Sequence, residues 1–466
     1  MVKHDSETEN HIAELIRAAE AGNAAAQVHL GWCYDEGDGV EVDHGKAFYW
    51  YTRSAEAGDA TGQFNLAMCY ELGTGTEIDY KKAFYWYEKA AERGDQHAIC
   101  QLGIFYEEGI GCDPDPVKAV EFYRKAGEIG NSLAVNRLGY CCEEGIGTEK
   151  NPALAVDFYK IAAAAGLVSA QYNLARCYDY AIGTRKNMRL AVKYYKFAAE
   201  QGDAEAQCNL GVCYENGTGV QQDSVQAVKW YKLAAAQDDA IALCNLGEAY
   251  YFGEGVKKCY KKAVEYYTKA AERGNGKAFY KLGICYEDGL GVKKNPVKAF
   301  ECFQKAAEDG YPRAVYYLGS CYYNGRGVEK DLAKAFFWHR NAAELGETTG
   351  MNDIATCDYG IEIPEPEKVE WLQKAVDAGD TFALCNLGVR YQLGKGVEKN
   401  EKMAMQLLRK SAKLNEPSAY YALYICYING RGVRKNRQLA LKYLRKSAEL
   451  GYPKARKVLK KLESGK

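Results

Sequence analysis

The stretch LGVCYENGTGVQQD, residues 210–223, combines residue types that occur in active sites and binding sites. Two glycines separated by one residue, Gly217 and Gly219, could cradle a phosphate group with their backbone N–H groups. A cysteine beside a tyrosine, Cys213 and Tyr214, could take part in redox or metal chemistry. Whether these residues form such a site depends on whether the stretch is unique in the chain.

The stretch recurs along the chain with a period of 36 residues. A P-loop also needs a strand before its glycines and Lys-Ser or Lys-Thr after them, so the recurring glycine pair fits a structural role better than phosphate binding. The period is marked by a reference leucine at 30, 66, 102, 138, 174, 210, 246, 282 and 318; it reaches Ile354, shortens to 33 residues before Leu387, and returns to 36 at Leu423 and Leu459.

Each repeat is predicted to contain two helices joined by the glycine pair. In the first helix, such as residues 204–217, small and apolar residues lie four before the leucine, at it, and three and four after it, which is a helical stripe. The second helix, such as residues 224–239, carries two bulky aromatic residues followed by Ala-Ala. The first glycine can end a helix in the left-handed conformation, and Asp223 after the pair can cap the next helix.

Half-repeats are expected at both ends. Residues 11–22 match the second helix at 47–58, and residues 453–463 match a lone first helix. Such half-repeats cap a stack, so the sequence predicts an all-α superhelical solenoid of about twelve helix–turn–helix repeats with two caps. The expected regions are a disordered tail over 1–10, a repeat array over 11–346, a degenerate repeat with an altered, proline-containing loop over 347–379, and further repeats with a basic capping helix over 380–466.

The pattern A-x-x-x-L-G-x-C-Y-x-x-G-x-G-V, followed by K-A-x-x-W-Y-x-x-A-A-x-x-G, resembles the Sel1-like repeat, a relative of the tetratricopeptide repeat. The resemblance extends over residues 11–463. It implies a non-catalytic scaffold or adaptor for protein partners rather than an enzyme. The alternatives are a self-assembling structural protein and a regulatory subunit or activator of an enzyme complex.

The chain contains 17 cysteines and six histidines. Nine cysteines lie three residues after the reference leucine, on the core stripe, where a thiol acts as a small apolar group. The cysteines form no C-x-x-C motif, and none are seven apart, the spacing that bridges the two helices in some members of the family. The histidines share no column and form no H-E-x-x-H motif. We therefore predict reduced structural thiols, no metal site and no cofactor.

A second stripe on the first helix avoids the core; it comprises positions five, two and one before the leucine and two and five after it. In the tetratricopeptide relatives this face lines a concave groove that grips peptides. Asparagine can donate to and accept from a peptide backbone, and tyrosines are common binding anchors. The alternative is that the asparagines bond to the neighbouring repeat. The predicted partner-binding residues are Asn65, Arg137, Tyr172, Asn173, Arg176, Asn209, Asn245, Tyr280, Lys281 and Tyr316.

Charge is unevenly distributed. Residues 1–150 contain 13 Lys or Arg and 27 Asp or Glu, whereas residues 395–466 contain 19 and 5. The basic end could bind an acidic protein or an anionic membrane surface, it could contact nucleic acid, or it could pair with the acidic end of another copy. Nucleic acid is disfavoured because no basic stripe with interleaved aromatic residues is evident.

No membrane span or signal peptide is predicted, so we expect a cytoplasmic protein. The acidic column five after the leucine, expected to form a solvated edge, is Asp35, Glu71, Glu107, Glu143, Asp179, Glu215 and Glu287.

Overall fold

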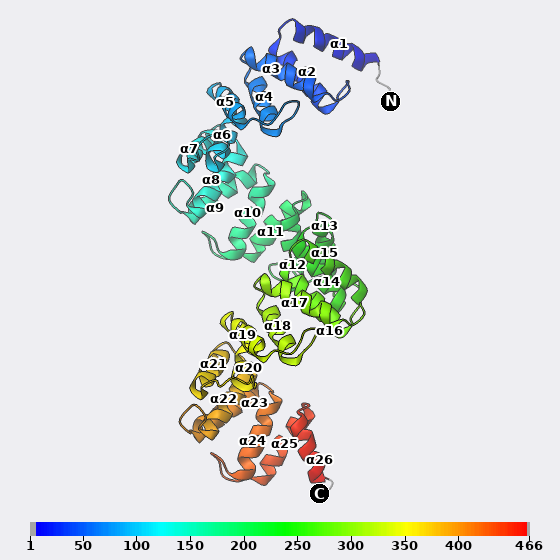
Figure 1. Ribbon diagram of the computed structural model, residues 1–466. Coiled ribbons are helices and arrows are strands. Elements are labelled where there is room, and N and C mark those ends of the chain that lie inside the picture. Colours follow the sequence, from blue (N-terminus) through cyan, green and yellow to red (C-terminus); the bar gives the residue numbers. More distant parts are fainter. Residues whose placement is uncertain (1–5, 464–466) are drawn as a thin grey trace. The chain divides into compact units, whose positions relative to one another are not determined.

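The computed structural model describes residues 6–463, which form helices joined by short turns (Figure 1). The chain divides into two compact units, Met1–Gln237 and Asp238–Lys466. The helices of the first unit are α1 (Ser6–Glu20), α2 (Ala24–Glu36), α3 (His44–Glu56), α4 (Ala60–Leu72), α5 (Tyr80–Glu92), α6 (Gln96–Glu108), α7 (Pro116–Glu128), α8 (Ser132–Glu144), α9 (Pro152–Ala164), α10 (Val168–Tyr180), α11 (Met188–Glu200), α12 (Ala204–Asn216) and α13 (Ser224–Ala235). The helices of the second unit are α14 (Ala240–Phe252), α15 (Tyr260–Glu272), α16 (Gly276–Asp288), α17 (Pro296–Glu308), α18 (Pro312–Asn324), α19 (Leu332–Glu344), α20 (Thr348–Thr356), α21 (Glu365–Asp377), α22 (Thr381–Leu393), α23 (Glu401–Lys413), α24 (Pro417–Asn429), α25 (Arg437–Glu449) and α26 (Pro453–Glu463).

The helix order confirms the predicted repeat array. A lone helix, α1, precedes six helix pairs in the first unit, and six further pairs precede the lone helix α26 in the second. Helix α1 begins at Ser6, so residues 6–10, expected in a disordered tail, are helical. The reason is that no glycine or proline interrupts the chain between residues 6 and 20. Residues 1–5 of the expected tail lie outside the described range.

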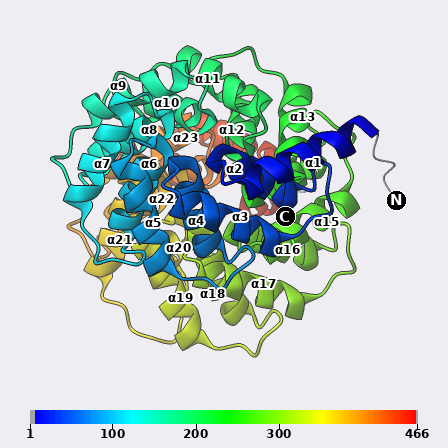
Figure 2. The same cartoon turned by 90° about the horizontal axis from the view of Figure 1, so that it is seen from above.

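The two helices of a pair lie on different sides of their unit. In the first unit, Figure 2 shows α6, α8 and α10 on the inner side of the curve formed by these repeats and α7, α9 and α11 on the outer side. In the second unit, α16 and α22 lie inside α17 and α21. The face of a first helix that points away from its second helix is therefore on the inner side of the unit.

The glycine pair joins the two helices of a repeat and contacts the preceding repeat. Gly217 ends α12 in the left-handed conformation, with φ of 67°, and Asp223 caps α13 by accepting from the backbone N–H of Val225 and Gln226 at 2.9 and 3.0 Å. Gly219 has a second role, because a Cβ at this position would lie only 2.3 Å from the carbonyl oxygen of Met188 in the preceding repeat. The first glycine turns the chain, and the second permits close contact between repeats.

The core is built from matching columns in successive repeats. The reference leucine, the alanine before it and most cysteines of the column after it are buried. A buried aromatic ring of the second helix packs on the residue after the leucine; Tyr123, for example, covers Gly103 so closely that a Cβ there would lie 2.5 Å from the ring. The tyrosines of this column are Tyr51, Tyr87, Tyr123, Tyr159, Tyr195, Tyr231 and Tyr267.

The tenth repeat has a different turn from the other repeats. Helix α20 has 9 residues instead of the usual 13, and it ends at Cys357 with extended backbone rather than at a left-handed glycine. Tyr359 and Ile363 in the following loop are buried against α19 and α21. Pro364 precedes α21, where its fixed φ and missing N–H are tolerated. The loop is therefore part of the core of this repeat.

Candidate partner-binding surface

The acidic column of the first unit is structural rather than a solvated edge. Five of its carboxylates accept a hydrogen bond from a tyrosine hydroxyl of the second helix in the same repeat, and the expectation of a solvated edge is wrong for them. The stripe pattern of one helix does not show this contact, because the tyrosine comes from the other helix. The pairs are Tyr87–Glu71 (2.5 Å), Tyr123–Glu107 (2.5 Å), Tyr159–Glu143 (2.8 Å), Tyr195–Asp179 (3.3 Å) and Tyr231–Glu215 (2.9 Å).

The tyrosine column changes in the second unit. The hydroxyl of Tyr267 is buried and has no hydrogen-bond partner among the described residues, because Tyr251 occupies the position that carries an acid in every repeat of the first unit. His339 replaces the tyrosine two repeats later, and its Nδ1 lies 2.6 Å from the hydroxyl of Tyr359 and its Nε2 3.3 Å from that of Ser320. Burial lowers the pKa of His339 to about 4, so the imidazole is neutral near pH 7.

Several residues predicted to bind a partner instead bond to an adjacent repeat. Arg176 donates to Glu143 at 2.8 Å, and Asn173 donates to Asn136 at 3.1 Å. Arg137 lies 3.9 Å from the carboxylate of Glu107. These contacts match the alternative in which polar residues of the inner face stabilise the stack.

The second unit contains the same kind of contact. Lys281 pairs with Glu248 of the preceding repeat at 2.7 Å, and Tyr316 donates to Asp353 of the following repeat at 3.1 Å. Burial alone would raise the pKa of Glu248, but hydrogen bonds from two lysines outweigh it and lower the pKa. This carboxylate therefore stays ionised as a link between two repeats.

Two predicted site residues, Asn245 and Tyr280, lie in the core. The ring of Tyr280 is covered by the rings of Tyr311 and Tyr317, with centroids 5.2 and 5.5 Å away. Tyr317 comes from the next repeat and Tyr311 from the turn that leads to it, so the position of Tyr280 on its own helix does not reveal the burial. The structure thus corrects the expectation that Asn245 and Tyr280 line a surface.

Three predicted residues remain partly exposed on the inner side of the first unit. Asn65 and Asn209 are half-buried, and no hydrogen bond joins their side chains to another part of residues 6–463. Asn65 lines a small cavity of about 60 Å³ together with Asp35 and Met68. Tyr172 is half-buried and packs against the ring of Tyr195 at a centroid distance of 6.0 Å.

Several exposed apolar residues of the inner side were not among those predicted. The position two after the leucine, beside the asparagine position on the next helical turn, is apolar in five of the six repeats of the first unit. Trp32, Met68 and Tyr140 are 45%, 37% and 39% exposed. The sequence feature that could have identified them is a column of apolar residues on a helix face that was predicted to meet solvent. We call this set the inner apolar row: Trp32, Met68, Ile104, Tyr140 and Val212.

The buried cysteines do not form a reactive site. Burial raises the pKa of Cys177 to about 12 and that of Cys213 to about 11, so both thiols stay protonated at neutral pH and are poor nucleophiles and metal ligands.

Within residues 6–463, His, Cys, Asp and Glu side chains form no cluster of three suited to a metal ion. In the same range, the helices are too short or too polar to span a membrane.

Helix pairs that contact mainly their neighbours along the chain define the α-solenoid class of repeat proteins. The Sel1 repeat model matches twelve segments of the sequence, and the chain therefore belongs to the Sel1 repeat family. Members of this family generally act as protein-interaction scaffolds. The matched residues are 24–59, 60–95, 96–131, 132–167, 168–203, 204–239, 240–275, 277–311, 312–347, 369–380, 381–416 and 417–452.

Two solved structures illustrate the similarity. The chain is 30% identical to c5321 of uropathogenic Escherichia coli, a protective antigen with an SLR fold, over 97% of this chain and 90% of that chain, with a TM-score of 0.62. It is 34% identical to a Sel1 repeat protein from Oxalobacter formigenes over 52% of this chain and 96% of that chain, with a TM-score of 0.48. Comparison with curated proteins gave no match.

Proposed function

We propose that this protein is a non-catalytic scaffold that binds an extended segment of a partner protein along the inner face of its first unit. The observation that supports this proposal is the inner apolar row. Trp32, Met68 and Tyr140 expose apolar side chains in the same column of three repeats. Aligned exposed apolar groups are a common feature of protein-interaction surfaces, and tryptophan and tyrosine are frequent anchors there.

A partner that follows the row from repeat to repeat has to be long and narrow, and an extended chain, which rises about 3.3 Å per residue, has this form. Asn65 and Asn209 flank the row and have side chains that can both donate to and accept from a peptide backbone. The partner segment would thus place apolar side chains on the row and backbone groups against the asparagines.

Selection from a random peptide library displayed on phage tests this proposal. Selected peptides should lose affinity for the variant Trp32→Ser/Met68→Ser/Tyr140→Ser. A matched control is Tyr49→Ser/Tyr85→Ser, because these tyrosines are also about half exposed but lie on second helices. Peptides that bind the inner-row variant as tightly as the wild-type chain would refute binding along this face.

A further inference from the structure

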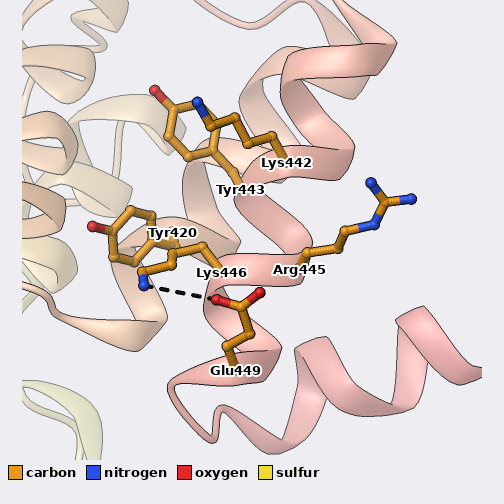
Figure 3. Close-up of a pocket in the computed structure, with 6 residues that line it drawn as sticks. All are labelled: Tyr420, Lys442, Tyr443, Arg445, Lys446 and Glu449. Carbon is orange, nitrogen blue, oxygen red and sulfur yellow. Dashed lines mark ion pairs between the residues drawn. The ribbon is translucent and has the colours of Figure 1, made fainter.

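A second hollow surface lies between α23 and α25, with Tyr420 of α24 between them. Two adjoining cavities of about 400 and 280 Å³ share Tyr420 and Tyr443, whose ring centroids are 6.1 Å apart. Figure 3 shows the two rings with Lys442 and Lys446 beside them. We call this surface the basic groove; the residues used to define it are Arg409, Lys413, Tyr420, Lys442, Tyr443 and Lys446.

Lys413 reverses the charge found at the same position of the other repeats. Ten of the other twelve second helices carry an acid there, and the remaining two carry alanine. In the corresponding cavity between α9 and α11, Ala164 stands at the place of Lys413, and Glu200 stands at the place of Glu449. The acids at this position are Glu20, Glu56, Glu92, Glu128, Glu200, Glu272, Glu308, Glu344, Asp377 and Glu449.

The base of the groove also differs from that of the corresponding groove in several other repeats. Gln27, Gln63 and Gln207 stand at the position of Tyr420, and each donates to a backbone carbonyl of the preceding second helix at 2.9–3.3 Å. Tyr420 replaces this amide by a ring that lies half exposed between two cavities. The substitution exchanges a contact within the stack for an aromatic surface that faces the groove.

The charge of the groove is positive and only partly balanced within the chain. Lys446 lies 3.7 Å from Glu449, which is the one carboxylate that lines the two cavities. Arg409 donates to the hydroxyl of Tyr427, a neutral acceptor, at 3.0 Å. A hollow lined by cations over aromatic rings concentrates positive potential, and this potential attracts an anionic ligand.

We propose that the basic groove binds an acidic peptide segment of a partner protein, at a site separate from the inner apolar row. Carboxylates of the segment pair with Lys413 and Lys442, and an apolar side chain between them packs on the rings of Tyr420 and Tyr443. The hollow form and aromatic base favour a narrow peptide over a flat anionic bilayer.

Fluorescence polarisation with a fluorescein-labelled peptide, Glu-Glu-Leu-Glu-Glu, tests the proposal on the full chain. The wild-type chain should bind this probe, with an affinity that falls as NaCl is added. Lys413→Glu and Tyr420→Gln introduce residues that other repeats already carry, so both should fold, and each should weaken binding by about tenfold or more. Lys435→Glu is the matched control, because it makes the same charge change at an exposed position outside both cavities.

The control and three alternative ligands decide the outcome. An equal loss of affinity in Lys435→Glu and Lys413→Glu would show a general charge effect and overturn the proposal, as would failure of the wild-type chain to bind the peptide. Binding that depends on Lys413 to phosphatidylserine vesicles or to single-stranded oligothymidine, in preference to the peptide, would also overturn it. Sedimentation at low salt tests whether the groove binds a second copy of the chain. Self-association that Lys413→Glu abolishes, without peptide binding, would assign the groove to that second copy and overturn the proposal.

Discussion

The same substitution, tyrosine to phenylalanine, should have opposite effects at two equivalent positions. The hydroxyl of Tyr159 donates to Glu143 at 2.8 Å, and Glu143 is only 4% exposed. Tyr159→Phe leaves this carboxylate with the guanidinium of Arg176, at 2.8 Å, as its hydrogen-bond partner among the described side chains. A hydrogen bond to a charged group contributes about 1.5–3 kcal/mol, so the substitution should destabilise the repeat by about 2 kcal/mol.

Tyr267→Phe removes a hydroxyl that is already buried without a partner in the described structure. An unsatisfied buried polar group costs about 1–3 kcal/mol, and the ring contact with Gly247 is retained. The expected result is a stabilisation of about 1 kcal/mol. The two variants should therefore differ by about 3 kcal/mol although they delete the same atom from the same column.

Hydrogen exchange of the amides in α9 and α15 measures the local opening free energy of each repeat. Urea denaturation followed by circular dichroism gives the global effect, and an unchanged slope shows that only stability has altered. Equal destabilisation by the two substitutions would refute the assignment of the acid–tyrosine pair as the source of stability. A loss of more than about 1 kcal/mol in Tyr267→Phe would do the same.

Three further predictions concern the joints and the buried polar groups. Gly147→Ala should destabilise by several kcal/mol more than Gly166→Ala, measured by urea denaturation, because both glycines have positive φ but only a Cβ at Gly147 would lie 2.0 Å from a carbonyl oxygen of α7. Arg176→Ala should cost about 2 kcal/mol and Asn209→Ala less than about 0.5 kcal/mol in thermal denaturation, because only the arginine pairs with a buried carboxylate. The pKa of His339 falls from 6.5 to about 4 on folding, so the free energy of unfolding of the wild-type chain should decrease by about 3 kcal/mol in total as the pH drops through this range. Urea titrations at several pH values measure this dependence, and His339→Phe should remove it.

The repeat architecture could be predicted because each structural requirement is stated many times in the sequence. The joint of Gly217 and Gly219 and the cap at Asp223 follow from local backbone chemistry, which needs no knowledge of packing. The partner of Glu143 could not be predicted in the same way, because its tyrosine comes from another helix. Tyr280 is likewise buried by the ring of Tyr317 in the next repeat and by that of Tyr311 in the intervening turn. The inner apolar row could have been predicted from its column of apolar residues on a helix face that the 3.6-residue period places away from the core.

The contact made by the second glycine of each joint bears on how such a chain changes length during evolution. Gly147, Gly183 and Gly219 each approach a backbone carbonyl of the preceding repeat, and a backbone carbonyl is present whatever side chain that repeat carries there. Insertion or deletion of one whole 36-residue segment therefore recreates the same joint between new neighbours. A gene for this protein can gain or lose repeats by unequal recombination and keep this backbone contact at the new junction, whereas side-chain links between particular repeats, such as that of Arg176 with Glu143, need replacement.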